Sequence, residues 1–119
     1  MLEPVRASFA ENKSLNWNRV AVLPDYVFFR HDIHIAKGVG CVECHGRVDE
    51  MALTYRANAL TMQFCLDCHR NPAPHLRPQQ QITSMDWKPA GDAGASGRAL
   101  LAQYNIRVGQ ITYCFVCHR

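Results

Sequence analysis

Three short motifs of one form carry most of the chemistry that this chain of 119 residues could do. Each has two cysteines three positions apart and a histidine directly after the second. The spacing C-x-x-C-H is the attachment signature of c-type haem. Two thiols so placed form thioethers with the two vinyl groups of one porphyrin, which holds the adjoining histidine beneath the iron. The chain therefore predicts three covalent c-type haems, bound by Cys41, Cys44 and His45, by Cys65, Cys68 and His69, and by Cys114, Cys117 and His118.

Two other uses of paired cysteines fit the pattern less well. Zinc sites built from C-x-x-C units use two pairs for each metal ion, and three pairs do not divide by two. A zinc site also needs no histidine after every second cysteine. A disulfide within each motif would close a loop too short to stabilise the fold appreciably. Neither alternative accounts for the three histidines.

The remaining histidines are candidates for the sixth position on each iron. His31 and His34 are three positions apart, so on a helical turn both project to one side and can serve two neighbouring irons. His75 lies in a proline-rich segment that we expect to be exposed. Met62 lies three residues before the second motif, and its thioether is a good soft ligand for haem iron. The chemistry alone does not separate His75 from Met62 as the third ligand.

Composition excludes several classes of protein. With 48% hydrophobic and 19% charged residues the chain is too apolar for a disordered protein. No run approaches the roughly 20 apolar residues of a membrane-spanning helix, and the first twenty residues lack a stretch of signal-peptide type. The formal net charge of +3 is spread along the chain, so no nucleic-acid footprint is evident. Six arginines are candidates to pair with haem propionates: Arg6, Arg19, Arg30, Arg56, Arg70 and Arg77.

The elements that must position these residues are few. We expect a mainly α fold with much irregular coil, a small multihaem cytochrome c domain whose core is largely haem. Residues 1–23 are predicted to form an extended N-terminal arm, and residues 24–119 the three-haem domain. Within it, residues 26–37 are expected to form a short strand that runs into a helical turn, ended by Gly38 and Gly40.

Three further segments follow. Residues 53–70 are predicted to form a helix that leads into the second motif, closed by Asn71 and Pro72. Residues 71–98, rich in Pro, Gln and Gly, are expected to be the loosest part. Residues 98–107 have helical spacing of apolar side chains, and Gly109 breaks that pattern before the third motif.

The segment from Phe29 to His34, followed by the first motif, resembles the opening F-x-H-x-x-H…C-x-x-C-H of small class III multihaem cytochromes. That resemblance implies that His31 binds the haem of the first motif and His34 the haem of the second. In three-haem members the third distal histidine stands four residues before the second motif. Here that position is Thr61, with Met62 beside it, which makes Met62 a plausible replacement.

A second resemblance covers nearly the whole chain. The chain is similar to the C-terminal part of the pentahaem cytochrome subunit of alternative complex III. The similar segments are residues 17–20, 23–27, 38–41, 44–49, 65–72, 85–89 and 117–119. That subunit is membrane-anchored and carries five haems. Two further C-x-x-C-H motifs and an anchoring helix are missing here. The chain is therefore either part of a longer one or a shortened relative with three haems.

These observations favour electron transfer over catalysis. An iron with two protein ligands has no open position for a substrate. The resemblance implies a relay from a quinol-oxidising membrane complex to a periplasmic cytochrome or an oxidase. Partners would be other subunits of a membrane-bound respiratory or photosynthetic complex and a second cytochrome, on the extracytoplasmic face of the membrane. The alternatives are a free three-haem periplasmic carrier and a haem reductase with one open iron.

Overall fold

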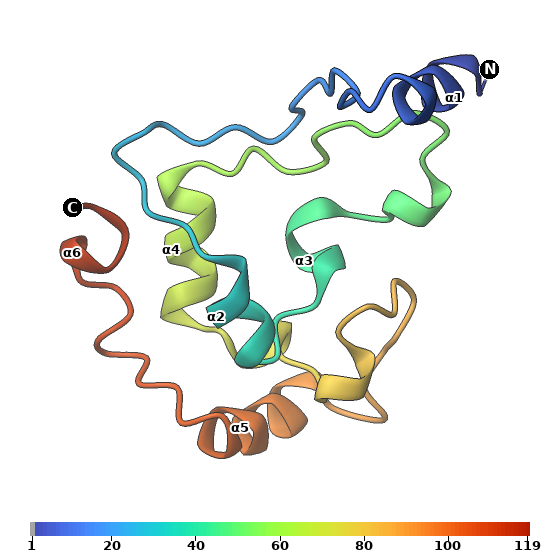
Figure 1. Ribbon diagram of the computed structural model, residues 1–119. Helices are drawn as coiled ribbons and strands as arrows, with labels where there is room; N and C mark the ends of the chain where they lie inside the picture. Colours follow the sequence, from blue (N-terminus) through green and yellow to red (C-terminus); the bar gives the residue numbers. More distant parts are fainter. Residues whose placement is uncertain (1) are drawn as a thin grey trace.

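Short helices joined by long irregular segments make up the chain in the computed structural model, which describes residues 2–119 (Figure 1). The α-helices are α1 (Glu3–Ala10), α2 (His31–Ala36), α3 (Cys41–His45), α4 (Met62–Arg70), α5 (Ala93–Gln103) and α6 (Cys114–Cys117). Single 3-10 turns are η1 (Val48–Glu50), η2 (Ala73–His75) and η3 (Gln79–Gln81). Residues 2–119 form no strand, only the isolated bridges Val27–His118 and Val39–Leu76. The expected mainly α and coil fold is confirmed.

The polypeptide is far more open than its length requires. Its radius of gyration is 17.1 Å, whereas a compact domain of this length has about 13.5 Å. Its accessible surface is 9050 Å², against roughly 6,500 Å² for a folded monomer of this mass. The buried hydrophobic residues among those described are Ala73, Leu76 and Ile82. The protein alone therefore lacks the core that would close the fold.

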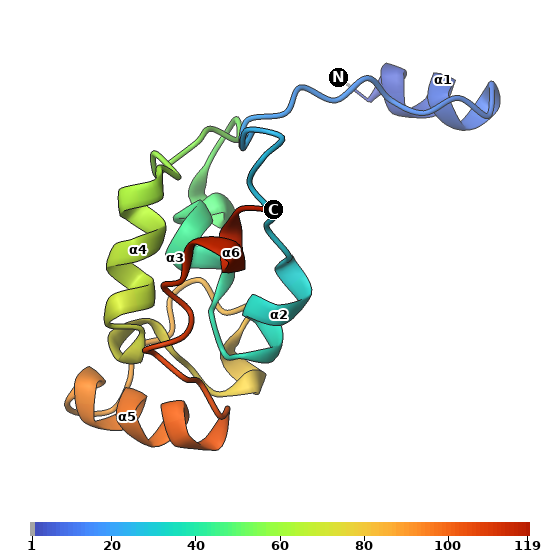
Figure 2. The ribbon, with the colours of Figure 1, turned by 90° about the vertical axis from the view of Figure 1, so that its left-hand side faces the viewer.

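The N-terminal arm contains a helix that the prediction of an extended segment missed. Helix α1 has Pro4 in its first turn. Backbone N–H groups in the first turn have no acceptor within the helix, so proline, which lacks an N–H, is tolerated there. Residues 13–19 after it have no regular structure. Figure 2 shows α1 projecting away from the rest of the molecule. Within residues 2–119, no helix combines the length and hydrophobicity needed to cross a bilayer.

Helix α2 ends where the two glycines predict. Gly38 has a φ of +82°, and its N–H donates to the Ile35 carbonyl at 3.0 Å. The Val39 N–H donates to the His34 carbonyl at 3.0 Å, which completes a Schellman motif. The chain turns directly from α2 into α3, so the two distal histidine candidates lie next to the first motif.

The predicted helix over 53–70 is wrong in its first half. Helix α4 begins only after Thr61, whose hydroxyl accepts the Phe64 N–H at 3.3 Å and caps the helix. Residues 53–61 form no helix. Leu60 also has a positive φ of 52°, which a helix would not accommodate. The helix thus contains Met62 and the whole second motif, but nothing before them.

The segment predicted to be loosest instead holds the small protein core. Ala73, Leu76 and Ile82 are its buried hydrophobic residues, and Arg77 beside them is only 3% exposed. Helix α5 also begins earlier than expected, because the Asp92 carboxylate accepts the N–H groups of the first helical turn. The glycine-rich stretch 93–97, part of the segment expected to be loosest, is therefore the first half of α5.

Gly97 allows α5 to pack against η2, and we expect its replacement to destabilise the fold. A Cβ atom at this buried position would lie 1.8 Å from the Ala73 carbonyl oxygen. In the Gly97→Ala variant α5 must move away, at a cost of about 1–3 kcal/mol in unfolding free energy. Denaturant unfolding of the haem-loaded protein measures this loss. In the matched Gly94→Ala variant the nearest atoms lie 3.4 Å away, so equal stability of the two variants would contradict the packing argument.

Candidate functional site

The three C-x-x-C-H motifs lie on helical turns, which explains how each brings its side chains together. In α3 and α4 the two cysteines and the histidine occupy positions i, i+3 and i+4 of one helix, and these share a face. The third histidine follows α6 directly. Its N–H donates to the Cys114 carbonyl at 2.8 Å, which continues the turn by one residue. Each motif thus presents two sulfur atoms and one imidazole in the same direction.

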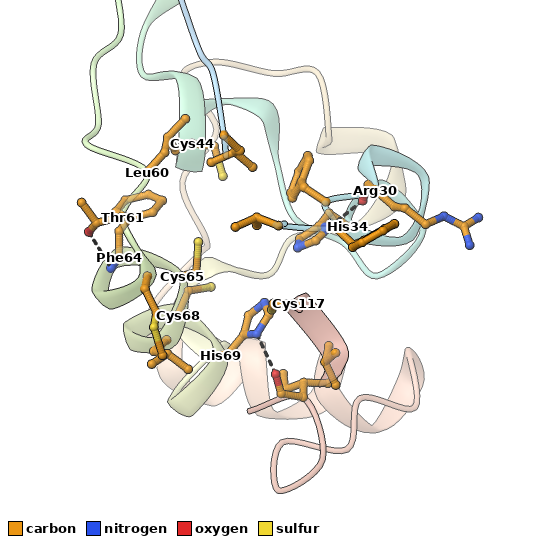
Figure 3. A pocket seen from close by; sticks show the side chains of 18 of the residues that line it. Arg30, His34, Cys44, Leu60, Thr61, Phe64, Cys65, Cys68, His69 and Cys117 are labelled. Carbon is orange, nitrogen blue, oxygen red and sulfur yellow. Dashed lines mark hydrogen bonds between the residues drawn. The ribbon is translucent and has the colours of Figure 1, made fainter. Parts of the chain in front are cut away.

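One cavity of about 1250 Å³ reaches all three motifs. It is larger than the roughly 300–1,000 Å³ of an ordinary small-molecule pocket. All but one of the predicted site residues line it, namely Cys44, His45, Cys65, Cys68, His69, Cys114, Cys117, His118, His31, His34, Met62 and His75. Cys41 is the exception. Figure 3 shows the sulfur atoms of Cys44 and Cys65 near one another, with the His34 and His69 rings entering from α2 and α4.

Two pairs of imidazole rings face one another across this cavity. His31 lies opposite His45 with ring centroids 6.1 Å apart and planes 8° from parallel. His34 lies opposite His69 at the same centroid distance and an interplanar angle of 25°. These are the two pairings that the class III resemblance implies.

A centroid distance of 6.1 Å is too long for contact between rings, but it fits one metal ion between them. An imidazole nitrogen binds a first-row metal at about 2.0–2.1 Å. Two imidazoles on opposite sides of one ion therefore have nitrogens about 4 Å apart and centroids roughly 6 Å apart. The donor set and its spacing fit a six-coordinate haem iron at each of the two places.

Backbone carbonyls orient several of these rings. The His34 Nδ1–H donates to the Arg30 carbonyl at 2.7 Å, and the His69 Nδ1–H donates to the Ile111 carbonyl at 2.8 Å. His118 makes a longer contact of 3.4 Å to the Tyr26 carbonyl. Since a carbonyl can only accept, Nδ1 carries the proton and Nε2 keeps its lone pair for a metal. This second contact is typical of metal-binding histidines.

Phe29 holds the two distal candidates in place. Its ring meets His31 edge-on at 4.7 Å and lies 4.6 Å from the ring of His34. Burial lowers the pKa of His34, which favours the neutral imidazole that can bind a metal. Phe29 therefore orients both His31 and His34 at the start of α2.

The third motif has no equivalent partner among the described residues. No imidazole faces His118 as His31 faces His45. Met62 and His75 both reach the cavity wall. Met62 is 64% exposed in the first turn of α4. His75, predicted to be exposed, is part-buried, and its Nδ1–H donates to a Glu43 carboxylate oxygen at 2.8 Å.

The cysteine geometry argues against the alternative uses. All six cysteines are free in the described chain, so no disulfide forms. Within residues 2–119 no three His, Cys, Asp or Glu side chains converge closely enough to hold a metal ion directly. Burial raises the pKa of Cys44, and raises that of Cys68 to about 11.

The comparison with protein families decides the identity. The family model for cytochrome c7 and related cytochrome c matches residues 27–119, a range that contains every predicted site residue. The chain belongs to this family. It is a multihaem c-type cytochrome, and its role is to carry electrons rather than to catalyse a reaction. No curated protein matches the chain.

Two residues of this cytochrome that matter at the site escaped the sequence prediction. Glu43 stands inside the first motif, where the residue between the cysteines has no required type. Arg77 was predicted only as one of six partners for propionates. In the structure Arg77 and Glu43 form an ion pair of 2.7 Å. No local sequence pattern predicts a contact between residues so far apart in the chain.

Proposed function

We propose that this cytochrome relays electrons through three c-type haems, one at each C-x-x-C-H motif. His45, His69 and His118 are the proximal ligands, and His31 and His34 are the distal ligands of the first and second haems. The two imidazole pairs with centroids 6.1 Å apart carry this proposal. Each bound haem supplies an iron that changes between its ferric and ferrous states.

The chain's own residues make electron transfer the function that fits best. With an imidazole on both sides, an iron has no position left for a substrate. Helix α2 carries both distal candidates within one turn, so His31 and His34 would hold the first and second haems in one cavity. Apolar side chains such as Phe28, Phe29 and Phe64 line part of that cavity.

A ligand-binding assay separates a carrier from a haem enzyme. We expect every iron of the purified protein to be low-spin and to bind neither cyanide nor carbon monoxide without denaturation. If any iron has a free coordination position, we expect it to be the iron bound by His118. High-spin ferric signals with carbon monoxide binding in the native state would instead indicate the reductase alternative.

We further propose Met62 as the sixth ligand of the third haem. His75 is hydrogen-bonded to Glu43 inside the first motif, where His31 and His45 would already hold the iron from both sides. Met62 precedes the second motif by one turn and lines the cavity that α6 reaches. Since methionine raises the potential of haem iron above that of a bis-histidine site, the third haem would be the electron sink of the relay.

Removing each candidate side chain tests this assignment. In the Met62→Ala variant we expect the absorption band of methionine–iron ligation to disappear while all haems stay attached. The matched His75→Ala variant should keep that band. An unchanged ferric spectrum in Met62→Ala, or loss of a low-spin haem in His75→Ala, would assign the position to another residue.

The setting in the cell is proposed on the sequence resemblance and on haem chemistry. Covalent haem is attached outside the cytoplasmic membrane, which supports an extracytoplasmic location. The segments shared with the alternative complex III subunit support a place in a membrane-bound respiratory or photosynthetic complex, with a second cytochrome or an oxidase as acceptor. Copurification with membrane subunits from native membranes would support this. A monomeric protein in the soluble fraction would favour the free-carrier alternative.

A further inference from the structure

Arg77 is a buried cation at the back of the first motif. Its side chain is only 4% exposed, and its guanidinium lies 5.3 Å from the centre of the Trp87 ring. One terminal nitrogen donates to the Ser84 carbonyl at 2.9 Å, and the other donates to Glu43 at 2.7 Å. The Arg77 Nε is buried against Gly40, where an added Cβ would lie 2.3 Å from it.

Arg77 does not line the cavity, although its buried Nε–H has no hydrogen-bond acceptor among the described residues. Its burial away from the cavity makes Arg77 a poor candidate for the pairing with haem propionates that the sequence predicts. Its only anionic partner among the described residues is Glu43, which lies between the two cysteines of the first motif. The guanidinium thus acts on the first site through this one carboxylate.

Glu43 is a half-buried anion next to the place where the first haem is attached. Its side chain is 24% exposed. Burial alone would raise the pKa of Glu43, but hydrogen bonds from His75 and Arg77 outweigh burial and lower it. A negative charge in a poorly solvated site acts strongly on neighbouring charges. The ferric state of a haem is one unit more positive than the ferrous state, so a bare carboxylate here would stabilise the ferric state.

We propose that Arg77, by neutralising Glu43, sets the reduction potential of the first haem and keeps it higher than the carboxylate alone would allow. Arg77 is a positioning and charge-balancing residue, since it touches neither the cavity nor a predicted ligand. This inference rests on the proposed haem at Cys41, Cys44 and His45. The potential of the first haem would then depend on this ion pair as well as on its two histidines.

Opposite charge changes at the two residues test the proposal. In Arg77→Met we expect the midpoint potential of the first haem to fall, because the carboxylate loses its cation. In Glu43→Gln, which keeps the shape of the side chain, we expect that potential to rise. The double variant should return close to wild type. The potentials are measured on the haem-loaded protein by redox titration, with each haem followed separately through the NMR signals of its methyl groups.

The control uses an arginine that comes just after the first motif in sequence but is exposed. Arg47 follows the first motif, is 40% exposed and pairs with Asp49 at 2.8 Å. Because water and salt screen that pair, Arg47→Met should shift the first potential much less. Shifts of the same sign in Arg77→Met and Glu43→Gln, no shift in either, or an equal shift in Arg47→Met would overturn the proposal. Absence of haem from the wild-type first motif would refute the proposed function itself, so the two failures are distinguishable.

Discussion

A chain made without haem is expected to be unfolded. In a variant with all six cysteines replaced by alanine, the cavity of about 1250 Å³ would have nothing to fill it. The buried hydrophobic residues of the described chain are one alanine and two aliphatic side chains. Ordering each residue costs roughly 1–2 kcal/mol in backbone entropy, and so small a core cannot offset that cost. The haem groups must therefore supply most of the buried apolar surface.

Circular dichroism, limited proteolysis and denaturant titration of this haem-free variant check the expectation. We expect little helical signal, rapid cleavage throughout the chain and no cooperative transition. The haem-loaded wild type, treated identically, should resist cleavage and unfold cooperatively. A cooperative transition in the haem-free chain would mean that the polypeptide has a sufficient core of its own.

Loss of His34 is expected to open the second haem to external ligands. The His34 ring lies 6.1 Å from His69, centroid to centroid, and the described chain shows no other imidazole opposite His69. In His34→Ala we therefore expect one of three irons to become high-spin in the ferric state and to bind carbon monoxide when reduced. Its potential should rise, since a strong donor to the ferric iron is gone.

The matched control is Ile35→Ala, one position along the same helix. Ile35 is 43% exposed and does not line the cavity, so its removal should leave all three haems low-spin. Optical and electron paramagnetic resonance spectra of both variants measure the outcome. If His34→Ala remained fully low-spin and bound no carbon monoxide, His34 could not be the distal ligand.

The chemistry of this cytochrome could be predicted from sequence because it is encoded locally. A C-x-x-C-H motif needs only one helical turn to bring its three side chains to one face. The same holds for His31 and His34, since one turn sets their direction wherever α2 lies in the fold. The pairing with particular proximal histidines came from the class III resemblance, and the ring geometry agrees with it.

The errors in the predicted elements have tertiary causes. Residues 53–61 carry helix-forming side chains, but the helix starts at the Thr61 cap. The glycine-rich start of α5 is helical because Asp92 caps it and Gly97 fits against η2. The proline-rich segment after α4 is buried because α5 covers it. Each outcome depends on a contact that no local pattern contains.

The link between Glu43 and Arg77 shows the same limit at the site. The residues are 34 positions apart, and the chain passes through α4 between them. Periodicity and motif spacing cannot pair such residues. The choice between Met62 and His75 is also a question of which atom faces α6, and the side-chain chemistry of both is suitable for iron.

The central claim is that every cysteine of this chain is committed to haem. Mass spectrometry of the intact, denatured protein, purified from a host that attaches c-type haem, tests it most directly. We predict a mass increase of three haems that persists under denaturing, reducing conditions, with no thiol left to react with an alkylating reagent. A mass increase of fewer than three haems, or cysteines that remain open to alkylation after reduction, would contradict the account.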